Sequence, residues 1–173
     1  KKDFVVHAVY LNWNLGSFFA RKGECRMTEY VYLRESEKPI VFIAGGTGFA
    51  PIKSIIEDMI FNKNKRKIYL YRGVRSEEDF YMTDLVNSWN KKLENLTYIP
   101  VVEDGSVKDA RNGYVHHAVL EDFNKLSDIQ IYCCGAPGLV ENAFIDLTKN
   151  GLPDDQFFAD AFTFAPKKNK KII

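Results

Sequence analysis

The residues best suited to chemistry form a glycine-rich segment, GGTG at positions 45–48. It directly follows the apolar run IVFIA and precedes a stretch with helical spacing that begins at Pro51. Glycines at such a joint let the backbone turn tightly and approach a pyrophosphate closely, while the N–H groups and positive dipole end of the next helix face the phosphates. The segment predicts a dinucleotide site whose binding residues are Gly45, Gly46, Thr47, Gly48, Ala50 and Pro51.

Other chemistries have less support from the sequence. The glycine spacing differs from GxGxxG, and no GK[ST] follows, so neither the two-half Rossmann fingerprint nor the P-loop fits. No Ser-His-Asp order and no recognisable pair of acidic residues argues for hydrolysis. His7, His116 and His117 have no carboxylate or cysteine at ligand spacing, so we expect helix-surface histidines and no metal site.

The elements that must position the loop alternate regularly from Pro39 onward. Short apolar runs occupy residues 39–44, 67–74, 96–102, 128–135 and 156–164, and helical patterns lie between them. Helix candidates cover 51–60, 76–92, 114–122 and 137–150, with Ser76 and Asp79 as start signals, Pro137 in a first turn and Gly151 at a C-terminus. This rhythm predicts an α/β fold, a three-layer sandwich with a five-stranded parallel sheet.

Composition narrows the class of protein. The chain has 173 residues, enough for one domain with a real core, and its formal net charge of +1 removes the electrostatic case for nucleic-acid binding. No apolar run is long enough to cross a bilayer, and the start lacks the apolar region of a signal peptide, so we expect a cytoplasmic protein. The three cysteines argue against a disulfide framework.

Three motifs occur in a characteristic order: GGTGFAP, then YRGVR after the second strand, then YCCGAPGLV after the fourth. Together they resemble the pyridine-nucleotide domain of the ferredoxin-NADP reductase superfamily, over residues 39–164. Within it, the segments IAGGTGFAPIKSII, LRESEKP and GLPDDQFFADAFT resemble reductases of the CDP-6-deoxy-delta-3,4-glucoseen reductase type and oxygenase reductase components.

The resemblance implies roles for single residues near the hydride-transfer centre. Thr47 would lie near the nicotinamide, and Cys134 would pack against it without forming a covalent intermediate; these two are the expected catalytic residues. Gly135, Ala136 and Pro137 continue this motif, and Phe162 would lie near the flavin edge or serve as a core strand residue. Cys133 is expected in the core, and a vicinal disulfide with Cys134 is disfavoured.

At the adenosine end, the resemblance places Arg75 beside the nucleotide, with an exposed charge at a strand end as the alternative. Glu103 and Asp104 follow the third strand, where a carboxylate can accept a hydrogen bond from a ribose 2′-hydroxyl but repels a 2′-phosphate. This favours NADH over NADPH. Lys108 and Arg111 are near enough in sequence to reverse that preference.

The resemblance divides the chain into residues 1–38, a remnant of an FAD-binding β-barrel domain, residues 39–164, the NAD(P)-binding domain, and a basic tail at 165–173. The chain lacks the RxYS motif of the flavin domain and an initiator methionine, which suggests a piece of a longer protein that does not retain FAD tightly by itself. The implied function is a flavoprotein oxidoreductase that passes hydride from NADH to FAD and electrons to an iron–sulfur (2Fe–2S) domain or partner. The alternative is an isolated nicotinamide-nucleotide-binding module.

Overall fold

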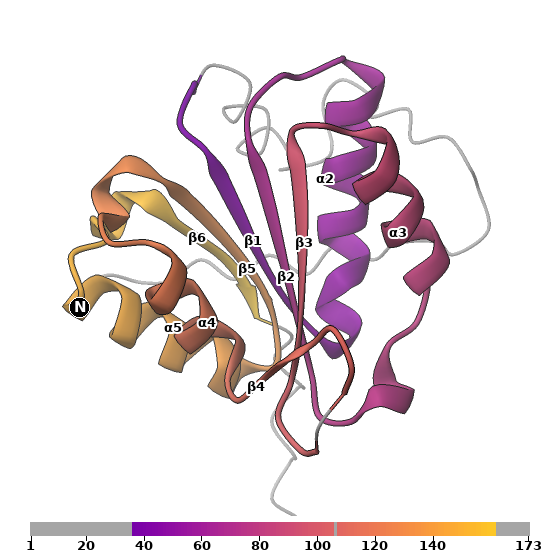
Figure 1. Cartoon of the computed structure of the whole chain (residues 1–173). Coiled ribbons are helices and arrows are strands. Elements are labelled where there is room, and N and C mark those ends of the chain that lie inside the picture. Colours follow the sequence, from indigo (N-terminus) through magenta and orange to yellow (C-terminus); the bar gives the residue numbers. More distant parts are fainter. Residues whose placement is uncertain (1–35, 106, 162–173) are drawn as a thin grey trace, which may run out of the picture.

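A computed structural model of the chain describes residues 36–105 and 107–161 around a central parallel sheet (Figure 1). The strand order across the sheet is β4-β3-β2-β1-β5-β6, and neighbouring strands pair in parallel. In chain order the strands are β1 (Ile40–Gly45), β2 (Ile68–Val74), β3 (Leu96–Val102), β4 (Arg111–Asn112), β5 (Gln130–Gly135) and β6 (Phe157–Ala161). The α/β class expected from the alternating pattern is confirmed.

The sheet has one strand more than the five expected. β4 consists of two residues, which pair with Val101 and Val102 at the end of β3. A two-residue strand has no apolar run and no alternation, so this segment was expected to be loop.

The helices cover both faces of the sheet and make the third layer. They are α2 (Phe49–Phe61), α3 (Thr83–Lys92), α4 (Val115–Asp122) and α5 (Pro137–Lys149). Figure 1 shows α2 and α3 on one face and α4 and α5 on the other. Strand β1 is buried on both sides: Ile40 and Phe42 pack toward α2, whereas Val41 and Ile43 pack toward α4 and α5. This explains why its sequence is continuously apolar rather than alternating.

The helix expected over 76–92 starts later than its sequence signals suggested. Ser76 and Asp79 do form a capping box, but it caps only a single 3₁₀ turn, Glu77–Asp79. Met82 then adopts a left-handed conformation (φ 54°), and α3 begins at Thr83. The interruption leaves Phe80 and Tyr81 outside any helix, where their rings contact a buried arginine described below.

The signals at both ends of α5 are confirmed. Pro137 occupies the first helical position, where its missing N–H removes no intrahelical bond. At the other end Gly151 has φ +99°, and its N–H donates to the carbonyl of Thr148 while Leu152 N–H donates to the carbonyl of Leu147. This pair of bonds is a Schellman motif, which glycine favours because it adopts positive φ without strain.

The chain reverses direction across the sheet at β1. From β1 it proceeds to β2 and β3 on one side, and then returns to place β5 on the other side of β1. The chain continues from the carboxyl end of β1 into α2 and from the carboxyl end of β5 into α5, and these two helices lie on opposite faces of the sheet (Figure 1). In open α/β sheets, ligands bind in the crevice at such a reversal point. None of the helices in the described ranges is both long and apolar enough to span a membrane.

Candidate functional site

The glycine loop and the Cys-Gly step meet at the reversal point. Ala44 at the end of β1 pairs with Cys134 in β5. A Cβ on Gly48 would overlap the backbone carbonyl of Cys134 and would lie only 2.7 Å from the backbone nitrogen of Gly135. The tertiary structure therefore brings together two motifs that lie almost ninety residues apart in the sequence, and only glycine fits at position 48.

The loop itself presents backbone to solvent. Gly46–Gly48 form a 3₁₀ turn that leads directly into α2, whose first three residues are Phe49, Ala50 and Pro51. Gly46 has φ +49°, and nothing lies within 4 Å of the place where its Cβ would be. Gly46 and Thr47 are exposed, so a phosphate could approach the backbone here without meeting a side chain. These residues fit a pyrophosphate at a helix N-terminus. Helix α2 begins at Phe49, two residues before the start at Pro51 that the sequence pattern indicated.

The second motif supplies a matching helix start on the other face. Gly135 packs against Gly45, since a Cβ there would lie 3.3 Å from the Cα of Gly45 and 2.9 Å from Leu139 Cδ2. Ala136 is the N-cap of α5 and Pro137 its first residue, and both are exposed. The N-termini of α2 and α5 thus flank the same end of the sheet, where their dipoles favour an anion.

The two adjacent cysteines face opposite sides of the sheet. Cys133 is fully buried in the core that α4 and α5 cover, as expected, and burial raises its thiol pKa well above the ordinary value. Cys134 is buried in the core on the α2 side. Neither cysteine forms a disulfide within the described residues. Consecutive strand side chains point away from each other, which leaves Cys134 as the cysteine on the face of the glycine loop's helix.

The three residues predicted for the adenosine end gather at the ends of β2 and β3. Backbone hydrogen bonds run from Glu103 N–H to Val74 and from Asp104 N–H to Arg75. Arg75 also donates from Nε to Asp104 Oδ2 at 3.2 Å, and both side chains are largely exposed. Arg75 is therefore already paired with one of the carboxylates that were predicted to meet the ribose.

Arg111 is held away from this group by α4. Its Nη2 donates to Asp122 Oδ1 at 2.7 Å, and its Nη1 donates to the carbonyl of Ala118. Tyr71 donates to the other oxygen of the same carboxylate at 2.6 Å. These contacts engage the Arg111 guanidinium at α4, and Lys108 is the basic residue nearest to Asp104 in sequence.

Sequence reasoning missed a buried arginine next to the loop. Arg72 on β2 is 1% exposed, and its guanidinium carbon lies 4.0 Å from the centre of the Phe49 ring and 5.1 Å from that of Tyr81. Tyr81 in turn donates to the carbonyl of Gly46 at 3.3 Å. Arg72 Nη1 has no hydrogen-bond partner among the described residues. The signal in the sequence is a charged residue inside the mostly apolar run 67–74.

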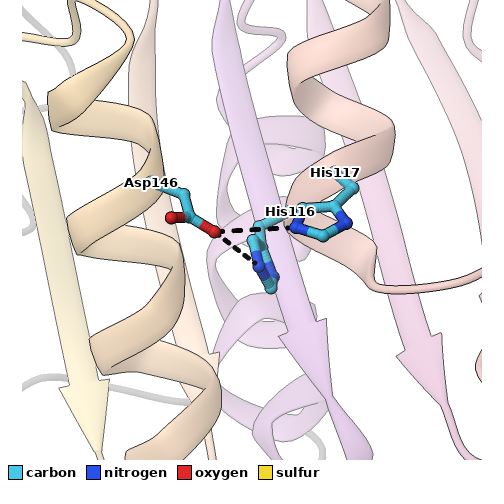
Figure 2. A group of neighbouring side chains, drawn as sticks. All are labelled: His116, His117 and Asp146. Carbon is cyan, nitrogen blue, oxygen red and sulfur yellow. Dashed lines mark ion pairs between the residues drawn. The ribbon is translucent and has the colours of Figure 1, made fainter.

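The expectation for the histidines is partly wrong. His117 is exposed on α4 as expected, but His116 is buried, and Figure 2 shows both side chains directed toward Asp146 on α5. Asp146 lies about thirty positions further along the chain, so ligand spacing in the sequence could not reveal it. His7 and Phe162 lie outside the described residues.

Comparison with known proteins decides the family. Residues 42–144 match the family described as the oxidoreductase NAD-binding domain. The chain belongs to this family. It is 42% identical over 132 residues to the CDP-6-deoxy-L-threo-D-glycero-4-hexulose-3-dehydrase reductase of Yersinia pestis, covering 76% of this chain and 40% of that protein. It is 36% identical over 134 residues to reductase component 1 of terephthalate 1,2-dioxygenase from Comamonas sp., covering 76% of this chain and 40% of that protein.

Two further matches extend the likeness. A probable flavin reductase of Vibrio harveyi is 35% identical over 169 residues, which are 95% of this chain and 70% of that protein. The crystal structure of the Amycolatopsis cytochrome P450 reductase GcoB superposes with a TM-score of 0.70 at 26% identity, over 75% of this chain and 39% of that one. The expected ferredoxin reductase superfamily and subgroup are thereby confirmed. The chain spans only about two-fifths of the Yersinia and Comamonas reductases.

Proposed function

We propose that this chain binds a nicotinamide dinucleotide, NADH in preference to NADPH, and holds it for hydride transfer to a flavin. The observation that carries this proposal is the packing of Gly48 against the Cys134 carbonyl. It brings together an exposed backbone loop, two helix N-termini and the Cys-Gly step at the point where the strand order reverses.

Each part of the site has a distinct task. The backbone of Gly46, Thr47 and Gly48 and the first turn of α2 would hold the pyrophosphate, and the Thr47 hydroxyl would orient the nicotinamide end. Cys134, on the face of the sheet that α2 covers, would pack against the nicotinamide ring. When bound, NADH supplies the hydride and a flavin accepts it, while the protein provides position and electrostatics.

The adenosine end would contact Arg75, Glu103 and Asp104. Asp104 and Glu103 are exposed carboxylates at the strand ends, and Arg111 is engaged by Asp122 instead of facing them. A 2′-phosphate would therefore meet two carboxylates, of which Asp104 is paired with Arg75. This arrangement supports the preference for NADH.

The complete protein would be a reductase that passes electrons from the flavin to an iron–sulfur centre. Support comes from the likeness to a dehydrase reductase, a dioxygenase reductase component and a flavin reductase. The alternative remains a binding module without a working flavin domain, because the residues assigned to that domain, 1–38, lie almost wholly outside the described part. We expect a cytoplasmic location, in line with the sequence.

Calorimetric titration of the chain with NADH tests the binding site. Thr47→Val should weaken NADH binding by about tenfold or less, the loss of one or two hydrogen bonds. Thr97→Val is the matched control: Thr97 is also exposed, but it lies at the opposite end of β3, so NADH affinity should not change. If the chain bound neither NADH nor NADPH, the proposal would be refuted.

Flavin absorbance separates the reductase from the binding module. With FAD added under anaerobic conditions, bleaching of the flavin on addition of NADH supports hydride transfer by this chain. A colourless protein that binds NADH but does not bleach added FAD supports the module.

A further inference from the structure

A second cluster of chemically competent side chains lies between α4 and α5, built by residues that the dinucleotide site does not use. His116 and His117 sit in the first turn of α4, and Asp146 lies near the end of α5 (Figure 2). Asp146 Oδ2 is 3.2 Å from His116 Nε2 and 3.6 Å from His117 Nε2. Ligand atoms from all three residues lie within 4.8 Å of one another.

Hydrogen bonding alone does not account for this convergence. The 3.6 Å separation between His117 Nε2 and Asp146 Oδ2 is too long for a hydrogen bond, yet the imidazole nitrogen faces the carboxylate. Among the described residues, no lysine or arginine is recorded at the Asp146 carboxylate, so its charge is shared only by the two imidazoles. Two rings and one carboxylate oxygen thus surround a common point.

The spacing between each imidazole and the carboxylate agrees with tetrahedral metal coordination. Metal–ligand bonds of about 2.0–2.2 Å place neighbouring ligand atoms of a tetrahedral zinc site roughly 3.3–3.5 Å apart. The two nitrogen–oxygen distances, 3.2 and 3.6 Å, bracket this value, and the ligand atoms of the two imidazoles lie within 4.8 Å of each other. We propose that His116, His117 and Asp146 bind a divalent transition-metal ion of the zinc class, which joins α4 to α5.

The surroundings define what kind of site this is. His117 and Asp146 are partly exposed, with 53% and 38% of their side chains accessible, so an ion can enter and a water can complete the coordination. Two nitrogen donors select zinc, cobalt or nickel over magnesium and calcium, which prefer all-oxygen sites.

One feature limits the affinity. His116 Nδ1 is buried and has no hydrogen-bond partner in the described part of the chain. With Nε2 on a metal, the ring proton would sit on Nδ1, where metal-binding histidines normally have an acceptor. The missing acceptor and the three-ligand set predict a dissociation constant of roughly micromolar order. This is weaker binding than closed structural sites show.

Zinc titration of the chain, first freed of metal with EDTA, tests the proposal by calorimetry and by imidazole chemical shifts in nuclear magnetic resonance. We expect one zinc ion per chain, shifts at His116 and His117, and no binding of Mg²⁺. Asp146→Asn and His117→Gln should each weaken zinc binding at least about tenfold. Both positions are partly exposed, so circular dichroism should show an intact fold.

Two controls make the result decisive. His7→Gln removes the remaining histidine of the chain, and Cys25→Ser removes a thiol that could bind zinc by itself. Neither substitution should alter zinc affinity. Absence of zinc binding, binding that survives both Asp146→Asn and His117→Gln, or binding lost with Cys25→Ser would overturn the proposal. NADH affinity, measured on the same variants, should be unchanged, since the metal site does not rest on the dinucleotide site.

Discussion

The guanidinium of Arg72 stacks on the ring of Phe49, the first residue of the helix that follows the glycine loop, at 4.0 Å from its centre. Tyr98 also hydrogen-bonds the guanidinium, and burial lowers the pKa of Arg72 from its usual range. Arginine nevertheless stays protonated in proteins, so a positive charge is held in an aromatic enclosure beside the proposed phosphate site.

Replacing Arg72 by methionine separates packing from electrostatics. An apolar side chain of similar length should leave the free energy of unfolding within about 1 kcal/mol of the wild type, or raise it, because a buried charge with an unpaired Nη1 is removed. NADH affinity should fall roughly three- to tenfold at low salt, through the lost attraction for phosphate. Thermal unfolding and NADH titration measure the two effects. Unchanged NADH affinity would show that Arg72 only packs.

Gly48→Ala should disrupt the junction of the two motifs. The new methyl group would overlap the Cys134 carbonyl, and backbone cannot move aside as a flexible side chain can. We expect a loss of about 1–3 kcal/mol in unfolding free energy and a large loss of NADH affinity. Gly138→Ala serves as the stability control, since nothing lies within 4 Å of the position of its Cβ. Equal stability of both variants in chemical denaturation would contradict this account of Gly48.

Tyr71 links β2 to α4 through Asp122, at 2.6 Å. Tyr71→Phe should cost about 1.5–3 kcal/mol, the range for a hydrogen bond to a charged group. In an Asp122→Asn background the same change should cost clearly less, which urea denaturation of the two single variants and the double variant would show. Equal costs in both backgrounds would mean that the two residues are not coupled.

The same pair predicts a pH dependence. Burial, followed by the hydrogen bond to Asp122, raises the pKa of Tyr71 in the folded protein well above its ordinary value of 10.0. Above about pH 10 the unfolded chain therefore loses this proton while the folded protein retains it, so this contribution to stability is present below pH 10 and declines above it. The wild type should lose stability relative to Tyr71→Phe between about pH 10 and 11. If the stabilities of the wild type and Tyr71→Phe changed in parallel over this pH range, the prediction would be wrong.

Coenzyme preference should respond to charge at the end of β3. Asp104→Asn removes the carboxylate that Arg75 contacts and leaves the arginine free to meet a 2′-phosphate. We expect the ratio of NADH to NADPH affinity to fall by roughly tenfold, measured by titration with each coenzyme. Asp155→Asn, an exposed carboxylate in a different turn, should leave the ratio unchanged. If the ratio of NADH to NADPH affinity were unchanged in Asp104→Asn, the adenosine ribose would not bind beside Asp104.

Local sequence was sufficient wherever a short-range physical rule decides the outcome. The apolar run 39–44 predicted a strand of a parallel sheet, and the structure has β1 there. Pro137 and Gly151 correctly marked the ends of α5, because proline fixes its own φ and glycine adopts positive φ without strain. The glycine segment likewise predicted the strand-to-helix joint at which we propose the phosphate site. The two-residue strand β4 and the late start of α3 escaped this reasoning; before α3, Phe80 and Tyr81 contact Arg72 instead of continuing a helix.

Contacts between distant segments were decided by the tertiary structure alone. The meeting of Gly48 with Cys134, the capture of Arg111 by Asp122, the enclosure of Arg72 and the approach of Asp146 to His116 all depend on strand order and helix placement. Sequence periodicity specifies which side of an element is buried but not which other element covers it. For this chain, the sequence therefore identified the loop that we propose meets the nucleotide, whereas packing across the sheet determined which side chains surround it.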